Sequence, residues 1–177
     1  MLQSIFHKYT FKPLVFITLL VAFLEIPFQP AFSSPKNSVK PRFTPKQYIE
    51  TFKPICDSLS VAYSIPSEVI LGIAMHESAY GNSKVCRLLN NHHGIAGRNN
   101  LQQTHGIKSR YRYFETDTAS FVAFCELVKK RKYYPGMIAE KKTTTQWLLT
   151  IGRAGYCRNP TAWTKEINMM LRRNQLI

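Results

Sequence analysis

Glu77 is the residue whose surroundings best suit acid–base chemistry. Ile70, Ile73 and Glu77 stand at i, i+3 and i+7, so a helix over residues 67–79 would place the carboxyl group on the face that carries the apolar side chains. Burial and the C-terminal end of a helix dipole both disfavour a charged carboxylate, as a general acid working near neutral pH requires. The alternative is that Glu77 lies at the helix edge and bonds a nearby cation or backbone group.

His76 and Glu77 also begin the pattern of a zinc protease, but that pattern needs a second histidine where this chain has Tyr80. His92 and His93 could supply metal ligands from the segment that follows. Adjacent histidines in a loop are, however, more often surface residues or hydrogen-bonding groups. We therefore expect neither a metal nor a cofactor.

Apolar residues recur at steps of three to four along much of the chain and predict six helices. The first has Thr44 as its N-cap and Pro45 at its first position, with Pro54 bending it. The others are expected over 67–79, 82–89, 118–130, 144–152 and 161–173. Residues 90–110 are rich in Gly, Asn, His and Gln, and residues 111–115 are short and aromatic enough for a strand. The pattern indicates a mainly helical (α+β) domain with a small β-lobe.

The charge balance of the chain is strongly basic. The 177 residues include 24 basic and 10 acidic side chains, a net charge of +14, while 45% of the residues are hydrophobic. A chain with so many apolar residues can bury a core, which excludes a disordered polycation. The charge predicts an anionic partner, and an exported protein meets anionic wall polymers and lipid headgroups before it meets nucleic acid.

The N-terminal residues are typical of a secretory signal. Basic residues precede the apolar run 14–24, which is followed by prolines and by Ala31 and Ser33 at a suitable cleavage site. We expect a signal peptide over 1–33, a linker over 34–43 and the working domain over 44–177, exported to the periplasm, the cell envelope or the exterior. The alternative is an uncleaved membrane anchor, which would then be the chain's one contact with a membrane.

The four cysteines all lie in the exported part, where an oxidising compartment would permit disulfides. Two bridges could form in three pairings, and buried free thiols are the alternative. The residues concerned are Cys56, Cys86, Cys125 and Cys157.

Two segments resemble a known family. Residues 69–83, VILGIAMHESAYGNS, and residues 90–95, NNHHGI, are similar to the glucosaminidase domain of bacterial peptidoglycan hydrolases, glycoside hydrolase family 73. The family pattern is an apolar helix with Ala, then Glu-Ser, two residues, Gly, one residue, Ser, and an Asn-x-x-Gly-Ile loop. Residues 155–160, GYCRNP, resemble its closing Gly-Tyr-Ala-x-Asp-Pro, and the likeness runs in order over residues 46–173.

The resemblance implies a monomeric, lysozyme-like helical domain whose β-lobe flanks a cleft, and an enzyme that cuts β-1,4 bonds of peptidoglycan as an endo-β-N-acetylglucosaminidase. It makes Glu77 the general acid, Tyr156 the tyrosine of the cleft, and Asn91 and Gly94 the substrate loop. Each also has a plainer interpretation: Tyr156 could only pack, and Gly94 could only supply a positive φ angle. Tyr113 and Tyr133 are expected to stack on sugar rings, or else to belong to the core.

The second carboxylate that glycoside hydrolysis usually needs is not obvious. Between Glu77 and Glu115 the chain has no Asp or Glu, although many relatives place an acid there. Glu115 is the better candidate, because Asp117 precedes a predicted helix as an N-cap would. The other two routes for the reaction are assistance by the substrate's N-acetyl group and attack by water without a strong base.

Two alternative functions do not involve catalysis. The protein could be a glycan-binding module that has lost turnover, or a basic protein that coats nucleic acid or anionic membrane.

Overall fold

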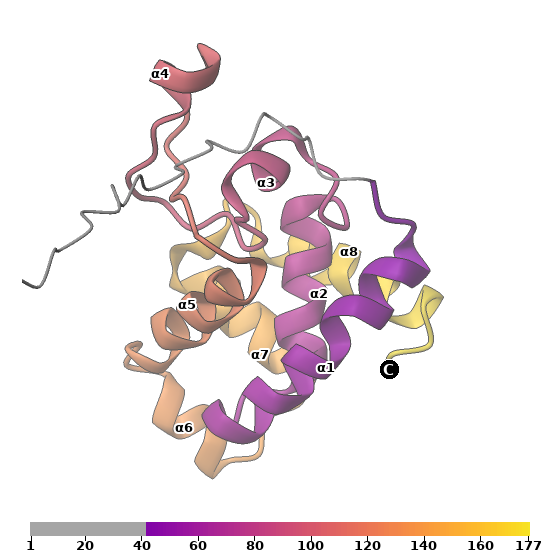
Figure 1. The fold of residues 1–177 in the computed structure, drawn as a ribbon. Coiled ribbons are helices and arrows are strands. Elements are labelled where there is room, and N and C mark those ends of the chain that lie inside the picture. Colours follow the sequence, from indigo (N-terminus) through magenta and orange to yellow (C-terminus); the bar gives the residue numbers. More distant parts are fainter. Residues whose placement is uncertain (1–41) are drawn as a thin grey trace, which may run out of the picture. The chain divides into compact units, whose positions relative to one another are not determined.

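The computed structural model describes residues 42–177, in which helices surround the central helix α2 (Figure 1). Helix α2 contacts α1, α5, α7 and α8. The signal segment expected over 1–33, and the linker up to residue 41, lie outside the described residues. The helices are α1 (Pro45–Tyr63), α2 (Ser67–Ser78), α3 (Lys84–Leu89), α4 (Leu101–His105), α5 (Asp117–Lys129), α6 (Tyr134–Ala139), α7 (Thr144–Ile151), the π-helix η1 (Gly152–Tyr156) and α8 (Pro160–Arg173).

Helix α1 begins where the sequence predicts, with Thr44 as its N-cap and Pro45 at its first position. The Thr44 hydroxyl accepts a hydrogen bond from the Gln47 backbone N–H, and the Gln47 side chain accepts from the Thr44 N–H. This reciprocal pair satisfies two N–H groups that a helix start leaves unpaired. The preceding residue, Phe43, exchanges two backbone hydrogen bonds with the Asn82 side chain, so the fold already includes the last residue of the expected linker.

Helix α2 is buried nearly all round, with eight of its twelve residues inaccessible. A helix that is apolar on every side belongs in the middle of a core rather than on its surface. It ends sharply because Ala79, Tyr80 and Gly81 all adopt positive φ angles. The Ser78 hydroxyl ties this turn together, donating to the Ala74 carbonyl and accepting from the Gly81 N–H. Glu77 is thereby fixed in the last turn of the helix.

The β-lobe that the sequence predicts contains almost no β-structure. Within residues 42–177 the one β interaction is an isolated antiparallel bridge between Ala96 and Tyr111, and the short helix α4 lies at the far end of the lobe (Figure 1). The prediction of a strand over 111–115 is wrong. The Gly97 N–H bonds the Arg110 carbonyl and the Arg112 N–H bonds the Ile95 carbonyl in one antiparallel register, but the Tyr113 N–H bonds the Arg98 carbonyl out of that register, so the ladder does not extend.

The N-cap of α5 is Thr116, whose hydroxyl accepts from the Ala119 N–H. The expectation that Asp117 caps this helix is therefore wrong by one residue. Asp117 occupies the first helical position, and its carboxylate bonds His92 instead. No sequence pattern predicts helix α6, because its six residues are too few to show a period.

Cys56, Cys125 and Cys157 are free thiols, so the two disulfides that the sequence permits are not formed. Cys56 and Cys125 belong to the core, and burial raises the pKa of Cys125 to about 12. Buried thiols of this kind behave as small apolar side chains. The structure thus favours the second of the two interpretations of the cysteines.

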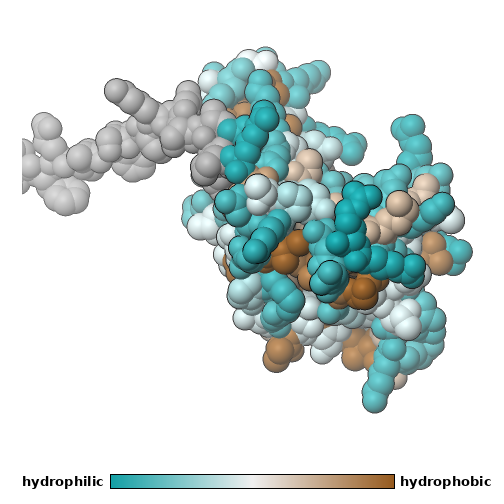
Figure 2. All heavy atoms as spheres, turned by 90° about the vertical axis from the view of Figure 1, so that its right-hand side faces the viewer, coloured by the Kyte–Doolittle hydropathy of each residue, from teal (hydrophilic) through white to brown (hydrophobic). Residues whose placement is uncertain are grey.

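Hydrophilic residues predominate on the face in Figure 2, where hydrophobic residues form small separate patches. Over residues 42–177, no helix is both long enough and apolar enough to cross a bilayer.

Candidate active site

Glu77 lies where α2, α8 and the loop after α3 meet. Its Oε1 accepts a hydrogen bond from the Trp163 indole N–H of α8 at 2.8 Å, and the His76 Nδ1 lies 3.3 Å from the same oxygen. The side chain is 27% exposed, so the carboxyl group is partly withdrawn from water and still reachable. Because Oε1 is occupied, Oε2 is the oxygen left to face a ligand.

Gly94 stands directly against that second oxygen. Its φ angle is +64°, and a Cβ atom added there would lie 3.4 Å from Glu77 Oε2 and 3.7 Å from Tyr111 Cε1. A positive φ favours glycine, and the missing side chain keeps the space in front of the carboxyl oxygen open. The positive φ angle of the plainer interpretation is confirmed, and the role of Gly94 in binding substrate stays a prediction.

Tyr156 holds this glycine loop from the opposite side. Its hydroxyl donates to the His93 carbonyl, and its ring lies against Trp163 with centroids 5.6 Å apart. Burial, and next the nearby Glu77 carboxylate, raise the pKa of Tyr156 well above its usual value, so the phenol stays protonated and remains a donor. The π-helix η1, in which Gly155 has φ +93°, delivers Tyr156 to this position.

His76 connects Glu77 to a second carboxylate. Its Nδ1 faces Glu77 Oε1 and its Nε2 lies 2.9 Å from Oε2 of Glu166 on α8. The bond with Glu77, and next the bond with Glu166, raise the pKa of His76 against the lowering effect of partial burial. A protonated imidazole has two N–H donors and can serve both carboxylates. The three residues form a chain from solvent to Glu77.

The histidines that follow α3 are buried rather than exposed. His92 Nε2 lies 2.9 Å from Asp117 Oδ1, and the Tyr48 hydroxyl lies 2.8 Å from His92 Nδ1. His93 stacks on Phe124 with centroids 4.3 Å apart and bonds the Ile70 carbonyl through Nε2. Burial lowers the pKa of His93 to about 3, so it is neutral at ordinary pH. Both histidines therefore position the loop. Within the described residues, no group of three His, Cys, Asp or Glu side chains could hold a metal ion.

Asn91 shapes the same loop. Its Nδ2 donates to the Ile95 and Arg112 carbonyls at 2.8 and 2.9 Å, and its Oδ1 accepts from the Ile95 N–H at 3.0 Å. Both amide hydrogens are thus used inside the protein, and the side chain is buried. Asn91 has no donor left for a substrate and acts on the site by fixing the loop that bears Gly94.

The structure does not bring the other predicted residues together around Glu77. Glu115 is exposed beside the N-cap of α5, and in the part of the chain that the structure describes no contact joins its side chain to Glu77. Tyr113 is exposed on the lobe at 47%. Tyr133 is half-buried and lies near Tyr156, and burial raises its pKa.

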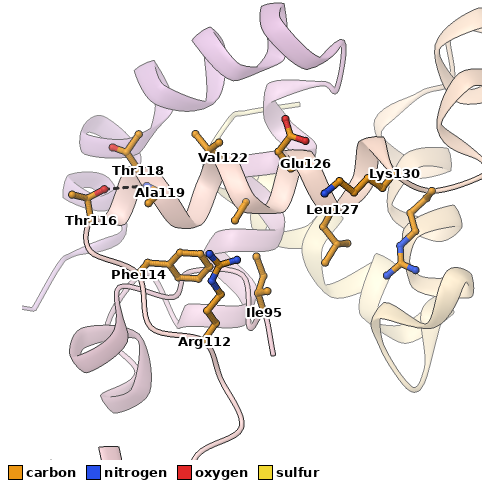
Figure 3. Close-up of a pocket in the computed structure, with 12 residues that line it drawn as sticks. Ile95, Arg112, Phe114, Thr116, Thr118, Ala119, Val122, Glu126, Leu127 and Lys130 are labelled. Carbon is orange, nitrogen blue, oxygen red and sulfur yellow. Dashed lines mark hydrogen bonds between the residues drawn. The ribbon is translucent and has the colours of Figure 1, made fainter. Parts of the chain in front are cut away.

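A groove of about 890 Å³ runs between the lobe and α5 (Figure 3). Its apolar lining includes Ile95 and Phe114 from the lobe side and Val122 and Leu127 from α5. Ile95 directly follows Gly94, so the groove begins next to the glycine that faces Glu77. The other lining residues are Arg112, Thr116, Thr118, Ala119, Ala123, Glu126, Lys130 and Arg131.

Sequence reasoning missed three partners of Glu77. Trp163 lies in the helix predicted over 161–173, but nothing local shows that its N–H reaches a residue 86 positions earlier. The zinc-protease pattern points to His76 as a metal ligand, and no motif marks Glu166. The one usable signal is that Trp163 and Glu166, three residues apart, share a helix face.

A protein family described as mannosyl-glycoprotein endo-β-N-acetylglucosaminidase matches residues 53–176. No curated protein sequence matches the chain. The catalytic domain of the autolysin Auto from Listeria monocytogenes has a similar fold, with 18% identity and a TM-score of 0.59 over 77% of this chain and 89% of that chain. The glycoside hydrolase domain of FlgJ from Salmonella typhimurium gives 16% identity and a TM-score of 0.57 over 75% and 89% of the two chains.

A chain in a type VI secretion system effector–immunity complex from Pseudomonas protegens is also similar. It has 20% identity and a TM-score of 0.51 over 73% of this chain and 91% of that chain. At these identities the three structures show a shared fold.

Proposed function

Because the chain belongs to the glucosaminidase family of glycoside hydrolases, we propose that it hydrolyses β-1,4 bonds in the glycan strands of peptidoglycan, with Glu77 as the general acid. One observation carries the assignment: the carboxyl group of Glu77 has one oxygen held by Trp163 and the other facing the opening that Gly94 leaves. The neighbouring folds, an autolysin and a glycoside hydrolase domain, accord with a wall glycan as substrate. The net charge of +14 suits an anionic wall.

In the proposed reaction the two oxygens of the Glu77 carboxyl group have different roles. Glu77 Oε2 gives its proton to the glycosidic oxygen, the bond from that oxygen to the anomeric carbon breaks, and the leaving sugar departs as an alcohol. Water then adds to the anomeric carbon and restores a proton to the site. The carboxylate left on Glu77 is stabilised by the Trp163 N–H and by the His76 ring, which contact Oε1.

The positive charge that develops at the anomeric carbon needs a partner. The Asp117 carboxylate is engaged with His92, which makes it a poor partner for this charge. Two of the expected routes could then stabilise this charge. Either the exposed Glu115 approaches when substrate binds, or the substrate's own N-acetyl group assists.

The bond that is cut can be read from the products. We expect the purified protein to release fragments from isolated peptidoglycan with N-acetylglucosamine at the new reducing ends, identified by mass spectrometry. N-acetylmuramic acid at those ends would instead make the protein a muramidase. Binding to the wall without any release would favour a glycan-binding module that has lost turnover.

The Glu166–His76 pair predicts a specific pH response. His76 has a raised pKa, because its ring bonds Glu77 and next Glu166, so its imidazolium persists to higher pH. Glu166→Gln removes one of these two bonds, so the His76 ring should lose its proton at lower pH than in the wild type, as an NMR titration of the ring measures. The pH–activity profile should change in the same variant if the imidazolium supports the reaction. An unchanged titration of His76, or a shifted titration with an unchanged activity profile, would exclude the pair from the reaction.

A further inference from the structure

The groove between the lobe and α5 combines an apolar lining with a cationic rim. Arg112 comes from the lobe and Lys130 follows the last turn of α5 (Figure 3). Arg131, the next residue in the chain, also lines the groove. Glu126 is the one acidic side chain in the lining, and its carboxylate already accepts a hydrogen bond from the Tyr63 hydroxyl at 2.7 Å. The three cations leave the groove with a positive excess that favours a ligand carrying carboxylates.

The chemistry of this lining does not suit a sugar. Carbohydrate rings bind best to flat aromatic faces surrounded by hydrogen-bonding groups. Among the lining residues Phe114 alone is aromatic, it is only 4% exposed, and the Arg112 guanidinium lies 4.8 Å from its ring centre. The uncharged remainder of the lining is one Ile, one Val, one Leu and two Ala, with two threonines. A chain of small apolar residues with acidic groups matches such a surface better.

Peptidoglycan carries a chain of this kind on the same strand that is cut. Its stem peptides join alanine methyl groups to free carboxylates and are attached to the muramic sugars of the glycan. We propose that the groove binds an acidic stem peptide of the glycan strand whose bond lies at Glu77. This inference rests on the function proposed above and adds a preference among its substrates.

The position of the groove supports simultaneous binding. Ile95 lines it and is adjacent to Gly94, whose Cβ position lies 3.4 Å from Glu77 Oε2. The Arg112 N–H bonds the Ile95 carbonyl at 2.8 Å, so the loop at the carboxyl group and the rim of the groove form one connected unit. A strand lying at Glu77 therefore brings a neighbouring stem peptide to the groove.

The test compares peptidoglycan strands that keep their peptides with strands stripped of them by an amidase. We expect the full-length protein to cut the peptide-bearing strands at least about tenfold faster, as one or two charge-assisted contacts would produce. Arg131→Gln and Arg112→Gln should each reduce this advantage several-fold while the rate on stripped strands stays within about twofold. Arg112→Lys, which keeps the charge, should retain most of the preference.

The matched control is Arg173→Gln, an exposed arginine at the end of α8 that does not line the groove. It should leave the preference unchanged. Thermal unfolding shows whether Arg112→Gln loses the preference only because the lobe is disturbed. Arg131 lies outside the lobe, so Arg131→Gln tests the groove without that effect. Equal rates of the wild type on the two substrates, or arginine variants that slow both equally, would overturn the peptide subsite alone. Failure to cut either substrate would overturn the proposed function and the subsite with it.

Discussion

Glu77→Gln should lose about 100- to 10,000-fold of the rate of glycan cleavage, the usual contribution of a positioned general acid. Glutamine has nearly the same shape and can still accept the Trp163 hydrogen bond, but it has no acidic proton to transfer. The variant should therefore fold and bind the wall like the wild type. The release of new reducing ends from peptidoglycan, together with thermal unfolding and a wall-pelleting assay, measures the three properties separately.

The matched control is Glu68→Gln in the first turn of the same helix. The nine-residue separation puts it about 13 Å from Glu77 along the helix axis. It should cost a few tenths of a kcal/mol in stability through the helix dipole and leave the cleavage rate unchanged. A Glu77→Gln variant that cuts as fast as the wild type would show that the acid lies elsewhere.

Gly94→Ala should reduce cleavage by about 10- to 100-fold, through its effect on the space in front of Glu77. The new methyl group would stand 3.4 Å from Oε2, the oxygen that must approach the glycosidic oxygen to within hydrogen-bonding distance. Alanine at a positive φ angle also costs about 1 kcal/mol of stability. Rate measurements on peptidoglycan and chemical denaturation separate the two effects.

Gly106→Ala provides the comparison. Gly106 has the same φ of +64°, but a Cβ atom added there would have nothing within 4 Å. It should lose similar stability and keep its activity. If the two alanine variants lose activity equally, backbone strain alone is responsible and the contact with Glu77 has no special importance.

Local signals in the sequence predicted the helices well because capping is local. Thr44 and Pro45 mark the start of α1, and the glycine-containing turn after Ser78 marks the end of α2. Asp117 failed as a cap because Thr116, one residue earlier, has an equally suitable hydroxyl. Residue type alone cannot show which of two adjacent residues, each able to cap a helix, is the N-cap.

The lobe was harder to predict because its structure depends on contacts with distant segments. An aromatic stretch such as residues 111–115 has strand propensity, yet a strand also needs a partner that stays in register. Here the bond between Arg112 and Ile95 keeps the register of the bridge, and the bond between Tyr113 and Arg98 leaves it. Similarly, the sequence and the family resemblance pointed to Glu77, while its contacts with Trp163, His76 and Glu166 follow only from how α8 packs on α2.

The hydrogen bonds that complete the candidate site span most of the domain. Trp163 reaches back 86 residues to Glu77, and Tyr156 reaches back 63 residues to the loop before Gly94. Closing such long loops is slow, so we expect these contacts to form late in folding. During synthesis from the N-terminus, Glu77 is made well before the segments that hold it. We therefore expect a partly synthesised chain to lack the contacts around Glu77 until α8 packs on α2.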